Sequence, residues 1–243
     1  CHLSIMDLIT QKRLDQANYA VTRELASHGF YDNHVEAVDT HLVLFGSAYG
    51  WQWYGSTGEI HIPCISLSRL SHLWNGGYTS LRDVLRHEFA HAIADTHRGL
   101  FRSSYFTDAF GAAHHWDFEW EYDPEHHVSE YAATAPAEDF AETFVYYLHI
   151  IGMLAIAVAA GVVLDSDRTD GIIAHDVEPA VDYRDLGLDR ALSDWRWLSM
   201  MFNRVNRSMG QRDLYPFTLT EPVVEKLAFV HRLVTAAGTS VAA

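Results

Sequence analysis

Apolar side chains recur at the three- and four-residue spacing of an amphipathic helix over residues 4–27, and Gly29 follows as a left-handed stop. The same spacing predicts helices over three later segments, residues 137–164, 192–207 and 221–236. The chain is therefore expected to be helical at its start and through most of its second half.

Three short segments between the first helix and residue 70 predict strands. They are residues 40–45, 51–54 and 59–67, separated by Gly46, Gly50, Gly55 and Gly58. Short connections with glycine are typical of hairpins, and we expect segment 59–67 to form an edge that could pair with an extended peptide. Thr79 or Ser80 is then placed to cap a further helix, which Arg98 and Gly99 can end.

Residues 116–123 follow a different pattern, because aromatic and acidic side chains alternate there at period two. In an extended segment this alternation places four aromatic rings on one face and four carboxylates on the other. A half-buried strand and the wall of a substrate cleft both fit the pattern. Together the elements predict an α+β fold in one domain, residues 1–243. Residues 1–100 would form a helix, a small mixed sheet and a second helix, and residues 101–243 a mainly helical lobe.

Composition narrows the possible partners. The formal net charge of -15 argues against nucleic acid or an anionic membrane, because both attract clusters of lysine and arginine. Residues 103–167 contain twelve acidic residues and no lysine or arginine, which favours basic substrates. The longest apolar run, residues 150–164, is shorter than the roughly 20 residues that cross a bilayer. We therefore expect a buried helix there and no membrane span.

Two histidines four residues apart supply the strongest candidate chemistry. They are His87 and His91 in the run His87-Glu88-Phe89-Ala90-His91. On a helix the two side chains lie about 40° apart around the axis and one turn apart, so both can reach one metal ion. Glu88 can then contact a metal-bound water as a general base. The two cysteines form no cysteine-rich zinc module, so histidines and carboxylates must hold the metal.

A catalytic zinc site needs a third protein ligand and an open position. Four candidates are His97, one of His114 and His115, one of His126 and His127, and Glu138. His97 would complete a metzincin spacing, but Ala94 stands where a glycine would let the helix break. His97 then lies about 80° off the face of His87 and roughly 9 Å beyond His91. The two histidine pairs lie in polar surroundings and fit solvated side chains better.

Glu138 is the favoured third ligand. The segment Pro136-Ala137-Glu138-Asp139-Phe140-Ala141-Glu142 has the composition of a helix start, which places Glu138 and Glu142 on one face. One carboxylate can bind the metal while Glu142 supports a ligand histidine through its far nitrogen. A helix N-terminus that is acidic only because of the helix dipole remains the alternative.

These residues resemble the gluzincins, the group that includes thermolysin and anthrax lethal factor. The run from His87 to Asp95 looks like their first metal-binding helix, and Glu138 to Glu142 is similar to the second helix of the lethal-factor group. The resemblance implies that Glu138 binds zinc, and that Tyr131, seven residues before it, stabilises the tetrahedral intermediate. Asp95 would have a structural or supporting role, or would be a surface carboxylate without one.

A wider resemblance is to the bacterial family called putative zinc-binding metallo-peptidases. It rests on the histidine motif and three blocks, Ser129-Glu130-Tyr131-Ala132, residues 136–149 and residues 203–217. The cysteine-rich zinc ribbon that often precedes the catalytic region in that family is missing here. Small Ala92 and Ala94 also replace common aromatic residues. The missing ribbon suggests a lone zincin-like catalytic domain. The sequence starts at Cys1 and not at a methionine, so a signal peptide stays possible and the compartment of this bacterial type of protein, cytoplasmic or secreted, stays open.

The leading hypothesis is hydrolysis of a peptide bond with one zinc ion held by His87, His91 and Glu138. Glu88 would take the proton of the attacking water and Tyr131 would donate to the oxyanion. The substrate would be a peptide or protein. Two alternatives stay open: a zinc-dependent amidase or deamidase acting on a non-peptide amide, and a zinc-stabilised binding module without activity.

Overall fold

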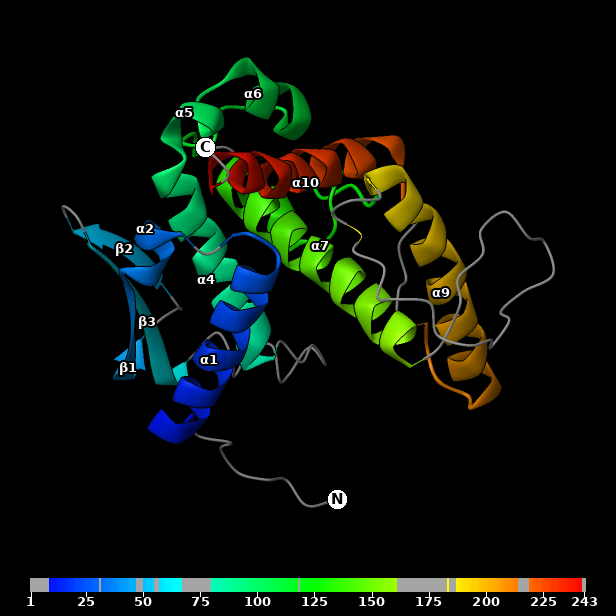
Figure 1. The fold of residues 1–243 in the computed structure, drawn as a ribbon, viewed down its shortest axis with the longest axis horizontal. Coiled ribbons are helices and arrows are strands. Elements are labelled where there is room, and N and C mark those ends of the chain that lie inside the picture. Colours follow the sequence, from blue (N-terminus) through cyan, green and yellow to red (C-terminus); the bar gives the residue numbers. More distant parts are fainter. Residues whose placement is uncertain are drawn as a thin grey trace.

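The computed structural model describes residues 9–30, 32–46, 50–54, 57–66, 80–117, 119–160, 183, 187–213 and 219–241. Figure 1 shows a small sheet on one side and long helices that cross beside it. The first half contains α1 (Gln11–Ser27), α2 (Asn33–Glu36), β1 (Val38–Gly46), β2 (Gly50–Tyr54), β3 (Thr57–Ser66) and α4 (Leu81–Thr96). The rest contains α5 (Arg98–Phe101), α6 (Ser104–Phe110), the short 3-10 helix η1 (Tyr131–Thr134), α7 (Pro136–Ala159), α9 (Leu188–Ser208) and α10 (Glu221–Val241). The fold is therefore a mixed α+β arrangement, as predicted.

The sheet has the strand order β1-β3-β2 and is mixed. β2 and β3 form the expected antiparallel hairpin, whereas β1 pairs with β3 in parallel. The prediction of a hairpin between the first two strands is wrong, and so is the prediction that segment 59–67 is an edge. A period-two pattern predicts a strand but does not predict which strands pair with it. In the structure β3 is the central strand, and its apolar residues Ile60 and Ile62 are fully buried.

Helix α4 packs on the sheet through a contact that depends on glycine. A Cβ atom at Gly58 would lie 1.9 Å from the ring of Trp51, so only glycine lets that indole lie against β3. The Trp51 Nε1–H donates to Asp95 Oδ2 at 2.7 Å. This hydrogen bond ties β2 to the last turn of α4 and fixes the helix relative to the sheet.

Local sequence signals predict some of the ends of α1 and α4 correctly and others not. Gly29 adopts a φ of 77° after α1, as expected, but the helix begins at Gln11 with Thr10 as its N-cap. Its predicted start at residue 4 lies outside the described residues. Ser80 caps α4 by accepting from the Asp83 N–H at 3.1 Å. Gly99 does not end α4, because that helix stops at Thr96 and Gly99 lies inside the single turn of α5.

A polar cluster holds α4 between α1 and α7. Arg86 of α4 donates from Nε and Nη2 to the two carboxylate oxygens of Glu24 in α1, at 2.9 and 2.8 Å. Its Nη1 donates to Asp83 Oδ1 at 2.6 Å, and His149 Nε2 of α7 lies 2.7 Å from the same oxygen. We call Glu24, Asp83, Arg86 and His149 the arginine cluster. Every charged group in it has a partner.

Helix α7 is the central helix. It starts at Pro136, a favoured first residue, and is buried over much of its length against α4, α9 and α10. Among the described helices, it alone has the length and apolar composition to cross a bilayer, and 56% of its most apolar window is buried inside the protein. Its first turn also carries Glu138 and Asp139. These features are typical of the core helix that the run 150–164 predicted.

Helix α10 closes the core over the start of α7. An aromatic cluster fills the space below α5 and α6, and its members are Phe101, Phe106, Phe110, Phe140 and Phe229. Beside it, Lys226 Nζ of α10 lies 2.6 Å from Asp139 Oδ2, with both side chains almost fully buried. Lys226 also donates to the carbonyl of His126. α10 thereby fixes both the first turn of α7 and the loop that precedes it.

Residues 116–123 do not form the predicted strand where the structure describes them. They form an irregular loop in which Trp116 and Tyr122 are 57% and 41% exposed, so the aromatic side chains do not share one buried face. The Trp120 N–H donates to the carbonyl of Ala133 in η1 at 2.8 Å. No strand of the sheet reaches this loop, and η1 is its only described backbone partner outside its own turns.

Candidate metal centre

The two histidines of α4 face a common point. His87 and His91 are one turn apart, and their Nε2 atoms lie 3.2 Å from each other. The ring centroids are 4.9 Å apart and the ring planes meet at 80°. Such an edge-on arrangement directs two nitrogen lone pairs toward the same position, as the four-residue spacing predicted.

Glu138 comes from the first turn of α7 and lies against both histidines. Its Oε2 is 2.9 Å from His87 Nε2 and 3.4 Å from His91 Nε2. The candidate ligand atoms of the three residues all lie within 4.8 Å of one another. The structure therefore brings together the three residues that the sequence favoured.

The donor set fits zinc. Bonds of about 2.0–2.2 Å to a tetrahedral zinc ion separate two ligand atoms by roughly 3.3 Å. The three separations found here are 2.9, 3.2 and 3.4 Å. Two imidazole nitrogens and one carboxylate oxygen leave a fourth position for water or substrate, which is the composition of catalytic zinc sites.

Electrostatics also favour a cation at this point. Burial alone would lower the pKa of His87, but hydrogen bonds to Glu138 and Glu142 outweigh it and raise the pKa to about 10. Burial alone would raise the pKa of Glu138, but hydrogen bonds to His87 and His91 hold that pKa well below its usual range. A metal ion bound at this position would satisfy the same nitrogen and oxygen atoms.

A second layer of contacts orients His87. Its Nδ1 lies 3.0 Å from Glu142 Oε1, as predicted for a carboxylate that supports a ligand histidine. The Ser129 hydroxyl donates to the other oxygen, Glu142 Oε2, at 2.7 Å. The same Ser129 oxygen accepts from the Ala132 N–H of η1 at 3.1 Å. Ser129 therefore links the loop that carries Tyr131 to the support of His87.

Glu88 has the placement of a base beside the histidines. The residue is only 6% exposed, and no hydrogen bond holds its carboxylate among the residues that the structure describes. Burial raises the pKa of Glu88, and the charges of His87 and His91 partly oppose the rise. A carboxylate held close to the site without a fixed partner can accept a proton there.

Tyr131 stands at the mouth of the site. Its ring centroid is 5.7 Å from that of His87, and the residue is 53% exposed. Partial burial and the carboxylates of Glu138, Glu88 and Glu142 raise the pKa of its phenol. The hydroxyl therefore stays protonated at neutral pH and can donate a hydrogen bond.

Asp95 and the remaining candidate histidines lie elsewhere. The Asp95 carboxylate binds Trp51 and lies 3.6 Å from Arg98 Nη2, so its observed contacts are structural and reach neither ligand histidine. His97 Nδ1 lies 3.0 Å from the carbonyl of Ile93. His126 pairs with Asp123, and His127 packs against Trp120. None of these histidines belongs to the described cluster of candidate ligands.

Sequence reasoning gave no role to Ser129, although it lies in a block that carries the family resemblance. Its role depends on the fold, which brings it to Glu142 across thirteen positions of sequence. A serine three residues before the Ala132 N–H is a common cap of a short turn, and this was the one available signal. This signal predicts that Ser129 caps a turn, but it does not predict the hydrogen bond from Ser129 to Glu142.

Comparison with known proteins agrees with the geometry. The sequence profile of a family described as "Putative zinc-binding metallo-peptidase" matches residues 74–233, which include every residue of the candidate centre. Uncharacterized proteins of Mycobacterium bovis and of two Mycobacterium tuberculosis strains are each 40% identical over 107 residues. That match covers 44% of this chain and 29% of each relative, so it spans less than a third of the relatives' length. No solved structure matches the chain.

Proposed function

The chain belongs to the family of putative zinc-binding metallo-peptidases, and we propose on that premise that it is a zinc-dependent peptidase with a zincin-like, gluzincin type of site. The observation that carries the proposal is the convergence of His87 Nε2, His91 Nε2 and Glu138 Oε2 on one point. The family match supports zinc binding and membership of the peptidase class in general terms. The assignment of individual roles is part of the proposal.

His87, His91 and Glu138 would hold one zinc ion. When bound, zinc supplies Lewis-acid polarisation of the substrate carbonyl and lowers the pKa of a water molecule. Glu142 would keep His87 in the tautomer that leaves Nε2 free to bind, because its carboxylate can accept a hydrogen bond from the Nδ1–H of His87. Ser129 in turn occupies the second oxygen of Glu142, so the carboxylate has one orientation.

Glu88 and Tyr131 would move and hold the protons of the reaction. Glu88 takes a proton from the attacking water onto a carboxylate oxygen and later gives it to the leaving amine. The Tyr131 hydroxyl would donate a hydrogen bond to the oxyanion that develops on the carbonyl oxygen. Tyr131 is partly exposed beside His87, where a substrate can reach it.

The exposed acidic residues near the site support a preference for basic groups in part of the substrate. Asp117, Glu119 and Glu121 are exposed on the loop that binds η1 through Trp120. A negative surface beside the site attracts cationic segments, most strongly at low ionic strength. The substrate proposed here is therefore a peptide or protein with basic residues on this side.

The substitution Glu88→Gln tests the proposal. It keeps the size of the side chain and removes the base, so we expect turnover of a peptide library to fall by about 10²–10⁴-fold. Zinc content, measured by elemental analysis of the same samples, should stay at one ion per chain. Glu225→Gln is the matched control, because Glu225 is an exposed residue of α10.

Each alternative predicts a different result. Full turnover in Glu88→Gln, or a purified wild-type protein that neither contains nor binds zinc, contradicts the proposal. Mass spectrometry of the products separates peptidase from deamidase chemistry, because deamidation changes the mass of a peptide without shortening it. A protein that binds zinc and cleaves no peptide would support the non-catalytic binding module.

A further inference from the structure

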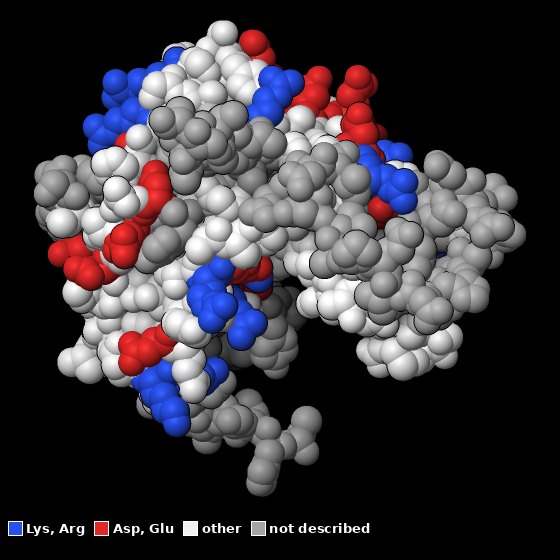
Figure 2. Space-filling view, in the orientation of Figure 1, with Lys and Arg blue, Asp and Glu red and all other residues white. Residues whose placement is uncertain are grey.

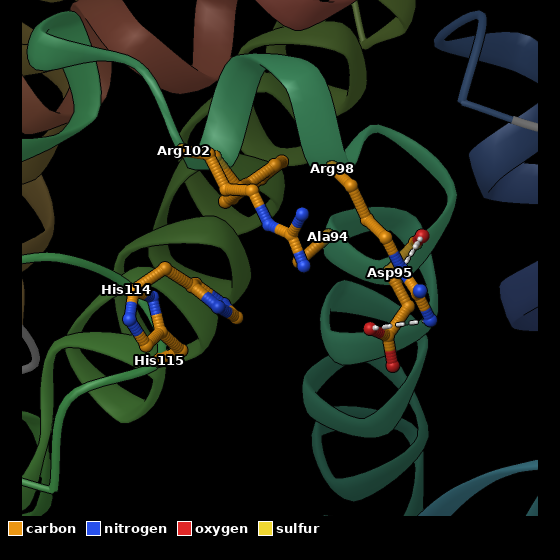
Figure 3. A pocket seen from close by; sticks show the side chains of 7 residues that line it. Ala94, Asp95, Arg98, Arg102, His114 and His115 are labelled. Carbon is orange, nitrogen blue, oxygen red and sulfur yellow. Dashed lines mark hydrogen bonds and ion pairs between the residues drawn. The ribbon is translucent and has the colours of Figure 1, made fainter.

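An open cavity of about 280 Å³ lies between the end of α4, α5 and the loop after α6 (Figure 3). It is lined by Ala94, Asp95, Arg98, Phe101, Arg102, His114 and His115. In Figure 3 the Arg102 side chain extends between the histidines on one side and α4 on the other. The volume is close to the lower end for ligand sites, about 300 Å³, and suits a single residue of a peptide.

The cavity carries a cation that the protein leaves without a partner. Arg98 is engaged with Asp95, through an ion pair of 3.6 Å and a hydrogen bond from Nε to the Asp95 carbonyl at 3.1 Å. No hydrogen bond or ion pair holds the guanidinium of Arg102 among the described residues. One positive charge is therefore available in a chain whose net charge is -15.

This positive charge belongs to a local group. Figure 2 shows basic side chains gathered over the corner of the molecule that α5 and α6 form. They are arginines, because the two lysines of the chain, Lys12 and Lys226, belong to α1 and α10. The acidic residues 117, 119 and 121 lie further along the same segment after α6, which follows His115 and binds η1 through Trp120.

The wall opposite Arg102 is polar and firmly held. The ring of His114 packs edge-on against Phe101 and Phe106, with centroids 5.1 and 5.3 Å away. Its Nε2 is buried without a hydrogen-bond partner among the described residues. Burial and the charge of His91 lower the pKa of His114 to about 4, so the ring adds a polar group to the cavity without adding charge at neutral pH.

The cavity adjoins the metal centre along one helix face. Asp95 follows His91 by four residues, which places it about 6 Å further along the axis and about 40° around it. An extended peptide advances about 3.3 Å per residue. A substrate whose scissile carbonyl lies at His91 therefore reaches the cavity within about two residues.

From these observations we propose that the cavity binds a carboxylate of the substrate, with Arg102 as the residue that recognises it; this inference rests on the proposed peptidase function. A guanidinium offers paired N–H donors that match the two oxygens of a carboxylate. The carboxylate comes either from an acidic side chain near the scissile bond or from the C-terminus of a peptide. The first makes the protein selective for an acidic position, and the second makes it cleave near peptide ends.

Paired peptides distinguish the two sources. One set carries glutamate or glutamine at each position in turn with an amidated C-terminus, and the other set has one sequence with a free or an amidated C-terminus. For the wild-type protein we expect kcat/KM to be about tenfold higher for one carboxylate form than for its neutral partner, the effect of one charge-assisted hydrogen bond. Equal values for both pairs overturn the proposal.

The variant Arg102→Gln should remove this discrimination, so that the carboxylate and neutral members of each pair are cleaved with similar kcat/KM. Arg82→Gln is the matched control, because Arg82 is an exposed residue at the start of α4 and does not line the cavity. It makes the same change in net charge and should keep the wild-type ratio. An unchanged ratio in Arg102→Gln, or an equal loss in Arg82→Gln, contradicts a role for Arg102.

A binding measurement separates this inference from the peptidase proposal. Zinc-loaded Glu88→Gln protein, with and without Arg102→Gln, is titrated with the same peptide pairs by calorimetry. If the carboxylate form binds more tightly than the neutral form and this preference disappears in Arg102→Gln, the carboxylate site is supported even if the wild-type protein cleaves nothing. Equal affinity for the two forms, or no binding of either, overturns it even if the wild-type protein is an active peptidase.

Discussion

Two polar clusters lie one residue apart on α4 and have opposite character. In the arginine cluster, Arg86 binds both oxygens of Glu24 and one of Asp83. In the metal centre, the next residue, His87, lies between the carboxylates of Glu138 and Glu142. Both clusters join α4 to α7 through histidine and carboxylate groups. They differ in whether the chain itself provides the cation.

The arginine cluster contains its own permanent positive charge. The metal centre contains three carboxylates, those of Glu88, Glu138 and Glu142, and two histidines, which become cationic only by taking up protons. A buried charge without a partner is strongly unfavourable, so the second cluster depends on a proton or an added cation. The comparison teaches that similar residues build a structural joint where an arginine supplies a permanent cation and a candidate binding site where no permanent cation is present.

The largest effect expected from this difference is stabilisation by zinc. At a free zinc concentration about 1,000 times the dissociation constant, binding should raise the free energy of unfolding by about 4 kcal/mol. Urea unfolding of zinc-free and zinc-loaded protein measures this gain. Glu138→Ala should abolish most of it, because one of three ligands is gone. An equal gain in that variant would place the zinc elsewhere.

Breaking the arginine cluster should lower the free energy of unfolding by nearly as much, and this loss should not involve zinc. Arg86→Met leaves Glu24 and Asp83 partly buried without their cation, and we expect a loss of about 3 kcal/mol in the unfolding free energy of the zinc-free protein. Arg82→Met, at an exposed position of the same helix, should change it by less than about 0.5 kcal/mol. Similar losses in both variants would mean that the cluster has no special role.

Loss of the Ser129 hydroxyl should loosen the metal centre and leave the arginine cluster intact. Because Ser129 orients Glu142, we expect Ser129→Ala to weaken zinc binding roughly tenfold. Competition with a fluorescent chelator measures the affinity, and Ser129→Thr, which keeps a hydroxyl, should recover most of it. Ser104→Ala, on the exposed side of α6, is the control. Unchanged affinity in Ser129→Ala would contradict the link to His87.

A smaller effect should appear in the acid unfolding of the arginine cluster. Burial alone would raise the pKa of Asp83, but His149, Ser80 and Arg86 hold that pKa well below its usual range. A carboxyl group with a lowered pKa in the folded state stabilises it above the unfolded pKa of about 4, and this stability is lost as the pH falls below that value.

The unfolding free energy of the zinc-free wild-type protein should therefore fall with decreasing pH below about 4 more steeply than that of Asp83→Asn. The difference should be about 1 kcal/mol once solvent screening is considered. Unfolding measured from pH 5 to pH 2 provides the comparison, and Asp108→Asn, at an exposed position of α6, should keep the wild-type slope. Parallel curves for wild type and Asp83→Asn would contradict the assignment.

The helices and the ligand trio could be predicted because their signals are local. The spacing of His87 and His91 fixes a shared face on any helix, and the start of α7 at Pro136 places Glu138 and Glu142 together. The prediction that α4 and α7 meet rested on the need for a third ligand. In the structure α4 and α7 do pack against each other, and this contact brings Glu138 to the two histidines.

Apart from the end of α4, which stops at Thr96 and not at Gly99, the failures concern pairing between distant segments. Alternation at residues 116–123 fits a strand, but no strand neighbour exists for it among the described residues, and the loop binds η1 instead. The partner of β3 could not be read from its own residues. Ser129 with Glu142, Trp51 with Asp95, and Lys226 with Asp139 are contacts that only the folded chain creates.

The ion pair between Lys226 and Asp139 has a consequence for the order of synthesis. A ribosome makes His87, His91 and Glu138 well before it reaches Lys226. Until then, the Asp139 carboxylate has no cation in its buried position, and the first turn of α7 has little reason to settle there. Glu138 is the neighbouring residue in that turn. The nascent chain is therefore expected to keep Glu138, the candidate third ligand, poorly placed until α10 emerges.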